Sequence, residues 1–362
     1  MRAPWLDWGE VGLAWRLALA PLDVLALVYG AGARCHRGVY DAHLRRRRRL
    51  SCRVISVGSL TVGGSGKTPL AAWIALQLRL RGRRVALATR GYGRVRTRGS
   101  ALTVVSDGKL IHGSAQARGD EPLLLAAQAP GVPVIVAPDR GLAGLRAVAL
   151  FGAEVLVLDD GFQHHRLARD LEIVCFDGAQ GLGGGRVLPR GPLREPLRGI
   201  SRADAVGIVD GPLGGVDAAK LTALTSGAFR FEARRRPLEL RSLDGKRTRP
   251  AARVAGMAVG LLSGVARPAG FRRTVEALGA SVVAERHFPD HHRYKQRDLR
   301  GLSKLAPLWL TTEKDALKIL PDWCGSADVE VLTIGLEVEH PGELVDWVES
   351  RLGRAGDVDA QR

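Results

Sequence analysis

The sequence predicts an α/β protein with a mostly parallel sheet, helices on both faces of that sheet, and a second, smaller α/β domain. Beyond residue 50, short apolar or β-branched runs alternate with stretches rich in Ala, Leu and Arg. This alternation is typical of strands and helices that follow one another in a parallel sheet. The chain has 362 residues, 46% of them hydrophobic, which is enough for two domains with their own cores.

A glycine-rich loop follows the first predicted strand, at 53–57, and precedes a predicted helix at 69–81. The loop consists of Thr61, Val62, Gly63, Gly64, Ser65, Gly66, Lys67 and Thr68. This order is typical of a phosphate-binding P-loop, in which backbone N–H groups and the positive end of the helix hold phosphate oxygens. Lys67 would reach the outer phosphates, and the Thr68 hydroxyl would bind a magnesium ion. We therefore predict a P-loop NTPase-like fold, although Thr61 replaces the first glycine of the usual pattern.

Further strands of this first unit are predicted at 85–89, 132–137, 155–158, 173–176 and 205–209. A helix is predicted at 142–151, and another begins at Asp120, where acidic residues precede Pro122. The segment 177–196 is rich in Gly and Pro and is predicted to be a long loop.

A second α/β set is predicted from residue 254, with strands near 257–261, 282–285, 308–311 and 329–334. Residues 229–240 are charged and alternating, so we expect an extended linker there. The expected organisation is an apolar helix with a basic segment at 1–50, a P-loop core at 51–228, a linker at 229–252, and a second domain at 253–362 that closes the cleft.

The N-terminal segment 11–29 is mostly apolar, but Arg16, Pro21 and Asp23 interrupt it. It lacks the roughly twenty apolar residues that crossing a bilayer requires. Tryptophans lie at its edge and an arginine run follows at 45–49. This pattern predicts a helix that lies on an anionic membrane surface, with peripheral attachment on the cytoplasmic face. The alternative is a helix packed on the protein's own core beside a solvated arginine run.

The chain is strongly basic, with a net charge of +17 and a pI near 10.7, which implies an anionic partner. Aromatic residues make up only 5%, and no basic–aromatic interleaving occurs, so nucleic acid is the weaker candidate and an anionic membrane with phosphorylated substrates the stronger. Four cysteines without pairing or metal-ligand spacing suit a reducing cytosol and are predicted to be buried thiols.

Asp159 and Asp160 directly follow the strand predicted at 155–158. Ligands bind at the carboxyl ends of strands in open parallel sheets, so a carboxylate here could hold magnesium beside Thr68. The alternative is a turn cap. Gln163, in the next turn, could orient a phosphate or a nucleophile.

Asp120 and Glu121 begin a helix that faces the same sheet edge, where a carboxylate could accept a hydroxyl proton during phosphoryl transfer to an alcohol. His291 follows a strand of the second domain and could pair with such a carboxylate across the cleft. A helix cap and a surface histidine remain adequate alternatives. The motif Thr312-Glu313-Lys314-Asp315 ends another strand, either as a structural ion-pair cluster or as a lining of the nucleotide pocket. Its lysine comes one position too late for the guanine-reading pattern, which argues against a GTPase.

The order of these motifs resembles the tetraacyldisaccharide 4′-kinase family, the lipid A kinases of Gram-negative bacteria. The shared motifs lie at 57–69, 90–93, 119–122, 159–164, 188–196, 264–268, 288–291 and 312–315. Thr61 in the P-loop is itself usual in that family. Arg190 stands where alanine is common, and the stretch 176–185 is looser than the family pattern.

This resemblance implies ATP-dependent phosphorylation of the 4′-hydroxyl of a tetraacyldisaccharide 1-phosphate, which forms lipid IVA at the cytoplasmic face of the inner membrane. ATP and Mg²⁺ would be the cofactors, and the partners would be the anionic glycolipid and the membrane surface, without nucleic acid or an obligate protein partner. Carried over by position, the site comprises Asp120 as base, His291 as its dyad partner, Lys67 on the transferring phosphates, Thr68, Glu121, Asp159 and Asp160 around magnesium, and Gln163 beside them.

We also hypothesise that Arg186, Arg190 and Arg194, on the glycine-rich loop, meet the substrate phosphate, because the planar guanidinium pairs well with phosphate oxygens. Two other classes of protein are alternatives. A membrane-associated P-loop ATPase of the partitioning or targeting type usually has a signature lysine where this chain has Val62. A nucleic-acid-dependent ATPase would explain the charge but not the apolar N-terminus.

Overall fold

The computed structural model describes residues 13–91, 102–113, 119–265, 268–290 and 292–353. The strands are β1 (Arg53–Gly58), β2 (Val85–Thr89), β3 (Thr103–Asp107), β4 (Pro133–Val136), β5 (Val155–Asp159), β6 (Leu171–Asp177), β7 (Ala205–Val209), β8 (Phe229–Ser242), β9 (Thr248–Pro250), β10 (Ala258–Ser263), β11 (Ser281–His287), β12 (Leu308–Thr312) and β13 (Asp328–Val338). The α-helices are α1 (Leu13–Asp41), α2 (Lys67–Leu80), α4 (Asp120–Gln128), α5 (Arg140–Phe151), α6 (Gly215–Leu224), α7 (Pro268–Ala277), α8 (Glu313–Ala316) and α9 (Pro341–Leu352). Short 3₁₀ helices are η2 (Gly183–Gly185), η3 (Leu197–Arg202), η4 (Ala251–Val254), η5 (Gln296–Leu299), η6 (Leu302–Lys304) and η7 (Pro321–Cys324).

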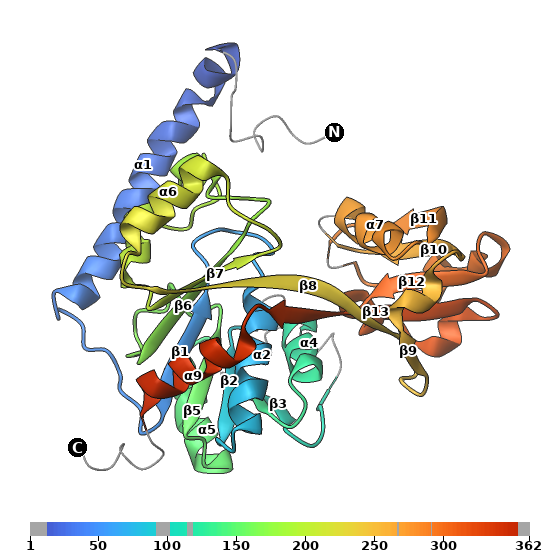
Figure 1. Ribbon diagram of the computed structural model, residues 1–362, viewed down its shortest axis with the longest axis horizontal. Helices are drawn as coiled ribbons and strands as arrows, with labels where there is room; N and C mark the ends of the chain where they lie inside the picture. Colours follow the sequence, from blue (N-terminus) through green and yellow to red (C-terminus); the bar gives the residue numbers. More distant parts are fainter. Residues whose placement is uncertain (1–12, 92–101, 114–118, 266–267, 291, 354–362) are drawn as a thin grey trace.

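The strands form one 13-stranded sheet in the order β11-β10-β12-β13-β8-β7-β6-β1-β5-β2-β4-β3, with β9 paired to β8. Neighbours are parallel except β8 with β13, β8 with β9, and β3 with β4. The predicted α/β class with a mostly parallel sheet is therefore confirmed. We call residues 51–228 the P-loop half and residues 253–328 the distal half; Figure 1 shows them on either side of the long strand β8.

Helices cover both faces of the P-loop half because alternate residues of its strands point to opposite sides. Ile55 and Val57 of β1 pack in the cluster that contains α2, α4 and α9. Val54 points the other way, into the cluster that contains Ala143 and Ala147 of α5. This double burial explains why the strands are continuously apolar rather than alternating.

The segment expected to be a linker at 229–252 is instead built into the sheet, since β8 occupies most of it. The first residues of β8 pair with β7, and the remainder pairs with β13. Arg236 forms an ion pair with Glu337 of β13, and Arg234 forms one with Glu339, the residue that follows β13. The start of β8 alternates apolar and charged residues, as a half-buried strand does, so the expectation of a linker was wrong.

The last helix, α9, belongs to the core of the P-loop half, although the sequence placed it with the second domain. Leu344 and Val348 of α9 lie in the same buried cluster as Leu70 and Leu78 of α2. The chain therefore crosses between the halves twice, through β8 and through β13, and returns at its end to the nucleotide-binding side.

Helix α1 is longer than the predicted apolar segment and lies along the outside of the P-loop half (Figure 1). Its exposed apolar residues are Val24, Leu25, Leu27, Val28 and Tyr29, with 41–69% of their surface accessible. Cys35 on this helix is exposed, so the expectation of buried thiols was wrong for that cysteine. Among the helices of the described ranges, none combines the length and apolarity that crossing a membrane requires.

Candidate active site

The P-loop connects β1 to α2 and has the backbone that its glycines predict. Gly63 and Gly66 adopt positive φ angles of 106° and 82°. Gly66 also packs so closely on Val209 that a Cβ there would lie 3.0 Å from a methyl carbon. A residue with a side chain at position 66 would be strained by the positive φ and would also crowd Val209, which explains the requirement for glycine.

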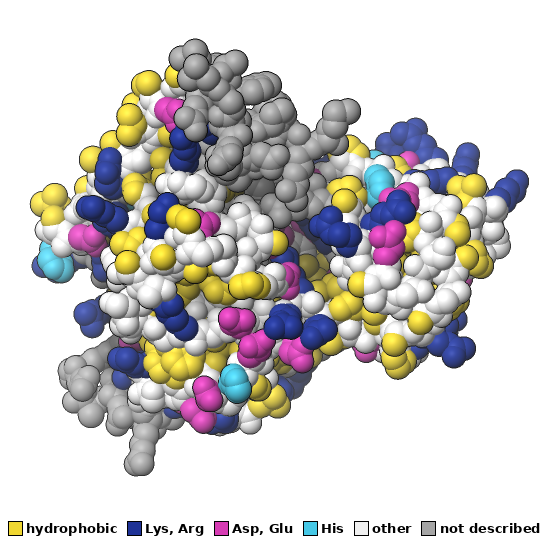
Figure 2. Space-filling view, turned by 45° about the horizontal axis from the view of Figure 1, so that its top comes forward, with side chains coloured by type: hydrophobic (Ala, Val, Ile, Leu, Met, Phe, Trp, Pro, Cys, Tyr) yellow, Lys and Arg dark blue, Asp and Glu magenta, His cyan; other side chains and the backbone are white. Residues whose placement is uncertain are grey.

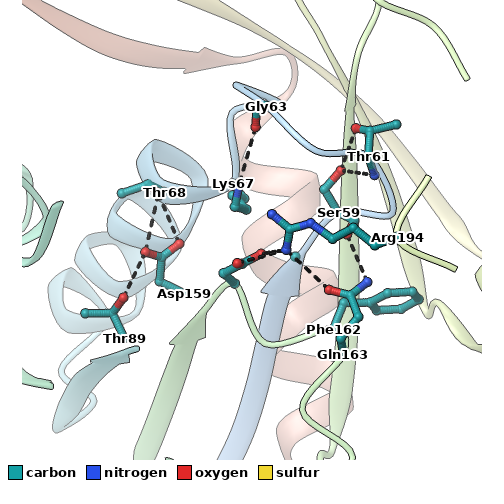
Figure 3. A network of polar contacts seen from close by, with 12 residues as sticks. Ser59, Thr61, Gly63, Lys67, Thr68, Thr89, Asp159, Phe162, Gln163 and Arg194 are labelled. Atoms are coloured by element: carbon teal, nitrogen blue, oxygen red, sulfur yellow. Dashed lines mark hydrogen bonds and ion pairs between the residues drawn. The ribbon is translucent and has the colours of Figure 1, made fainter. Parts of the chain in front are cut away.

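The start of the loop is fixed by polar contacts to the 186–196 segment. The amide of Val62 donates to the Pro192 carbonyl at 2.8 Å, and the amide of Arg194 donates to the Leu60 carbonyl at 2.7 Å. Ser59 and Thr61 share a hydroxyl contact of 3.0 Å (Figure 3). Thr61 thus serves as a buried polar anchor where many P-loops have glycine.

Lys67 and Thr68 begin α2 and point to the carboxyl edge of the sheet. Lys67 Nζ donates to the Gly63 carbonyl at 3.3 Å, so the lysine folds over the loop that would hold the phosphates. Thr68 Oγ1 donates to Asp159 at 3.1 Å, and Thr89 Oγ1 donates to the same carboxylate at 3.4 Å (Figure 3). The predicted neighbourhood of Lys67, Thr68 and Asp159 is therefore present.

Asp159 is almost fully buried at the end of β5. Burial raises its pKa to about 7, and the nearby charges of Asp160 and Glu121 contribute to the increase. A buried carboxylate with hydroxyl neighbours and further acids nearby is poorly stabilised by the protein alone and well suited to a hard cation.

Asp160 has a different environment, because Arg194 Nη1 donates to both of its carboxylate oxygens at 2.7 and 2.9 Å. Burial opposes ionisation, but the attraction of Lys67 and Arg194 outweighs it and lowers the pKa of Asp160. Asp160 also has a positive φ of 56°, which is unusual for a residue other than glycine and is typical of functional turns.

Gln163 lies between the P-loop and the loop at 186–196. Its Nε2 donates to the Ser59 carbonyl at 3.1 Å and to Glu195 at 3.0 Å, while its Oε1 accepts from Arg194 at 3.4 Å. The side chain therefore connects the P-loop strand, Glu195 and Arg194. It lies in the turn after β5, beside the nucleotide site.

Asp120 and Glu121 begin α4, and the Asp120 carboxylate is buried. Asp120 Oδ1 accepts the amide of Glu121 at 3.2 Å, and Oδ2 faces Lys314 and Lys318 of the distal half at 3.9 and 3.8 Å. The charge of Glu121 contributes to the raised pKa of Asp159, so Glu121 lies near that carboxylate.

His291 lies outside the described residues, so its predicted pairing with Asp120 stays a prediction. Its neighbours in sequence are described. Asp290 accepts from Lys314 at 3.0 Å, and His292 contacts Asp298 at 3.0 Å while stacking on Phe288. Lys314 therefore connects the residue before His291 with the carboxylate of Asp120.

The three loop arginines have different ion-pair partners in the structure, and their contact with the substrate phosphate stays a prediction. Arg186 and Arg190 pair with Asp23 of α1 at 2.9 and 3.3 Å, and Arg190 is buried. Arg194 instead pairs with Asp160 in the nucleotide site. The loop folds back between α1 and the P-loop, so its basic side chains point in different directions.

Sequence reasoning missed several residues that the fold brings to this edge. Arg140, buried at the start of α5, donates to the backbone carbonyl of Asp160 at 3.4 Å. Arg235 of β8 donates to the Gly64 carbonyl at 3.2 Å and pairs with Asp177 and Asp210. No local motif indicated these two arginines, because each reaches the site from an element distant in sequence.

A cavity of about 420 Å³ between β7, α6 and β8 is lined by none of the site residues described above.

The donor set fits magnesium better than a transition metal. Thr68, Glu121 and Asp159 offer oxygen atoms only, which is the ligand type that Mg²⁺ prefers. Within the described ranges, no cluster of three or more His, Cys, Asp or Glu side chains could hold a metal by itself.

Comparisons with known proteins agree with this geometry. The family profile of tetraacyldisaccharide-1-P 4′-kinase matches residues 16–353. A protein from Anaeromyxobacter sp. (strain Fw109-5) named tetraacyldisaccharide 4′-kinase is 42% identical over 358 residues, which cover 94% of this chain and 93% of the relative. A protein of the same name from Syntrophus aciditrophicus (strain SB) is 42% identical over 317 residues, covering 83% of this chain and 84% of the relative.

A solved structure is similar over nearly the whole fold. It is the "apo" form of LpxK from Aquifex aeolicus in complex with ATP, with a TM-score of 0.75 and 31% identity, covering 94% of this chain and 100% of that chain. These matches do not favour the alternative of a partitioning or targeting ATPase. The chain belongs to the tetraacyldisaccharide-1-P 4′-kinase family.

Proposed function

We propose that this chain transfers the terminal phosphoryl group of Mg²⁺-bound ATP to the 4′-hydroxyl of a tetraacyldisaccharide 1-phosphate. Family membership makes the chain a kinase of lipid A biosynthesis. The observation that carries the finer assignment is the contact between Thr68 and the buried Asp159 beside the P-loop lysine. This arrangement suits a metal-bound triphosphate, and Asp120 offers a second carboxylate at the same edge.

On the nucleotide side, backbone amides of 62–67 would hold the phosphate oxygens of ATP, and Lys67 would leave the Gly63 carbonyl to contact the outer phosphates. Thr68, Asp159 and Glu121 would hold Mg²⁺, which when bound neutralises charge on the phosphate oxygens. Arg194 keeps Asp160 ionised and in place, and its guanidinium would approach the transferring phosphoryl group.

On the acceptor side, Asp120 would accept the proton of the sugar hydroxyl. A carboxylate in this role must lie within hydrogen-bond reach of the alcohol, and its burial keeps water from competing. His291 would be its partner. The distal half, which carries residue 291, would form the second unit of the predicted organisation and close over the nucleotide.

Helix α1 would attach the enzyme to the cytoplasmic face of the inner membrane, where an acylated acceptor resides. Its exposed apolar residues line one side of the helix, and Figure 2 shows hydrophobic side chains with Lys and Arg beside them along that edge. Apolar burial and attraction to anionic headgroups together support peripheral binding. A protein lacking residues 1–34 that bound anionic liposomes as strongly as the full chain would contradict this.

The test of the proposed function is transfer of label from [γ-³²P]ATP in three parallel reactions: with the lipid acceptor, with liposomes alone, and without lipid. We expect labelled lipid in the first reaction only, dependence on Mg²⁺, and loss of transfer in Lys67→Ala by about 3–4 kcal/mol of transition-state stabilisation. Release of free phosphate at equal rates in all three reactions would contradict the kinase assignment.

A further inference from the structure

Two lysines of the distal half converge on the carboxylate that the proposed function uses as its base. Lys314 Nζ lies 3.9 Å from Asp120 Oδ2, and Lys318 Nζ lies 3.8 Å from the same oxygen. Both come from the turn of chain that begins with α8, four residues apart, so they share one face of that turn.

The turn is rigid where it presents these lysines. Asp315 is fully buried, and its Oδ2 accepts from the amide of Gly264 at 2.9 Å and from Thr312 Oγ1 at 2.7 Å. Its Oδ1 lies 3.2 Å from Lys318 Nζ, which is itself only 10% exposed. Lys318 is therefore held on one side by a buried carboxylate of its own half and faces Asp120 on the other.

Lys314 also contacts the residue next to His291, the proposed dyad partner of Asp120. It contacts Asp290 at 3.0 Å, and Asp290 directly precedes His291 in the chain. A second contact joins the same elements farther along, where Gln128 at the end of α4 donates to Glu313 of α8 at 3.4 Å. Helix α4 is thus attached to α8 at both of its ends.

We propose that Lys318, assisted by Lys314, is a positioning residue for phosphoryl transfer. The two ammonium groups fix the Asp120 carboxylate and attach the distal half to the start of α4. Their distances of 3.8 and 3.9 Å from Oδ2 are longer than a hydrogen bond, so these two lysines attract the carboxylate through charge rather than by donating to it. This inference rests on the proposed role of Asp120 and assigns to it the residues that orient it.

The experiment is a double-mutant cycle measured as acceptor-dependent phosphate transfer. Lys318→Met keeps the length of the side chain and removes the charge, and we expect it to lower kcat about tenfold or more while leaving the KM for ATP unchanged. In the Asp120→Asn background the same substitution should have almost no further effect. Lys318→Arg, which keeps the positive charge, should recover most of the activity.

Lys304→Met provides the matched control, because Lys304 is an exposed lysine of the same half. It should leave kcat, the KM for ATP and the melting temperature at wild-type values. Because Lys318→Met also leaves the buried Asp315 without its cation, it could unfold the protein. Lys314→Met leaves the Asp315–Lys318 pair intact, so it carries the test in that case and should lower kcat several-fold.

The outcomes separate this inference from the proposed function. If Lys318→Met and Asp120→Asn reduce kcat by independent, multiplying factors, or if both lysine variants keep wild-type kcat, the positioning role is wrong and the kinase assignment stands. If Asp120→Asn alone keeps full turnover, the base assignment fails and the positioning role fails with it. Loss of the Lys318→Met effect in the Asp120→Asn background, with recovery in Lys318→Arg, supports the inference.

Discussion

Arg194 donates through Nη1 to both carboxylate oxygens of Asp160, at 2.7 and 2.9 Å, whereas the neighbouring Asp159 accepts from the hydroxyl of Thr68. Two consecutive acids thus have different partners. Asp159 keeps a pKa raised to about 7 although the charge of Lys67 lowers it, while Asp160 is paired with a guanidinium.

This difference predicts which carboxylate binds magnesium directly. Asp159→Asn should raise the Mg²⁺ concentration for half-maximal turnover by at least about tenfold, since second-sphere changes alone reach that size. Asp160→Asn should act mainly on kcat, because its loss releases Arg194. The measurement is turnover against free Mg²⁺ at saturating ATP for both variants. Equal Mg²⁺ requirements in the two variants would contradict the assignment.

The P-loop and the acidic pair could be predicted from the sequence because their residues are adjacent and their spacing is dictated by local backbone geometry. The positions of Lys318 and Arg235 could not, since each meets the site through an element that returns from far along the chain. Arg186 shows the same limit, because its partner Asp23 lies 163 positions away. Arg186 and Arg194 are close in sequence, but their ion-pair partners Asp23 and Asp160 belong to different parts of the fold.

In the fold, too, features set by local sequence could be predicted, and features set by contacts between distant elements could not. Buried parallel strands such as β1 and β5 are runs of apolar residues and were predicted nearly to their ends. Strand β8 was expected to be a linker because of its many charged residues, although its start alternates as a half-buried strand does. Helix α9 was placed with the wrong core because amphipathicity shows that a helix packs but not against which core.

The exposed apolar side of α1 leads to a prediction about membrane binding. Leu27→Glu should weaken binding to anionic liposomes roughly 10- to 100-fold, the loss expected for one large apolar side chain, without lowering the melting temperature. Leu80→Glu is the matched control, since Leu80 is 72% exposed, close to the 69% of Leu27, but lies on α2. Cosedimentation with vesicles measures both. Equal loss in the two variants would indicate a nonspecific effect of charge.

Gly58, at the end of β1, allows the turn after β5 to pack against the P-loop strand. A Cβ there would lie 2.6 Å from the Cβ and 2.9 Å from the amide nitrogen of Phe162. Gly58→Ala should therefore destabilise the protein by about 1–3 kcal/mol and lower turnover, because Gln163 directly follows Phe162 and Asp160 lies two residues before it. Urea unfolding gives the stability change. Gly32→Ala, where nothing lies within 4 Å of the added carbon, should cost nothing.

The environment of His165 leads to a prediction about how low pH affects the packing of α1 against the P-loop half. The imidazole is buried against His36 and Tyr40 of that helix, with ring centroids 5.6 and 6.2 Å away. Burial, followed by the charges of Arg202 and Arg169 and, more weakly, of His36 and Arg47, lowers the pKa of His165 from 6.5 to about 3. The unfolded chain therefore binds a proton between these pH values that the folded protein does not.

Stability from this residue is complete above pH 6.5 and is lost as the pH falls toward 3, because protonation favours the unfolded chain. The difference in unfolding free energy between pH 7.5 and pH 5 should thus be smaller in His165→Gln than in the wild type. His112→Gln is the control, since that histidine is half exposed beside Asp107 and far from α1 in sequence. Urea unfolding at both pH values measures the difference, and protease cleavage within α1 at pH 5 reports its release. An unchanged pH dependence in His165→Gln would show that the acid sensitivity comes from other groups, because this substitution removes the imidazole and leaves the surrounding arginines in place.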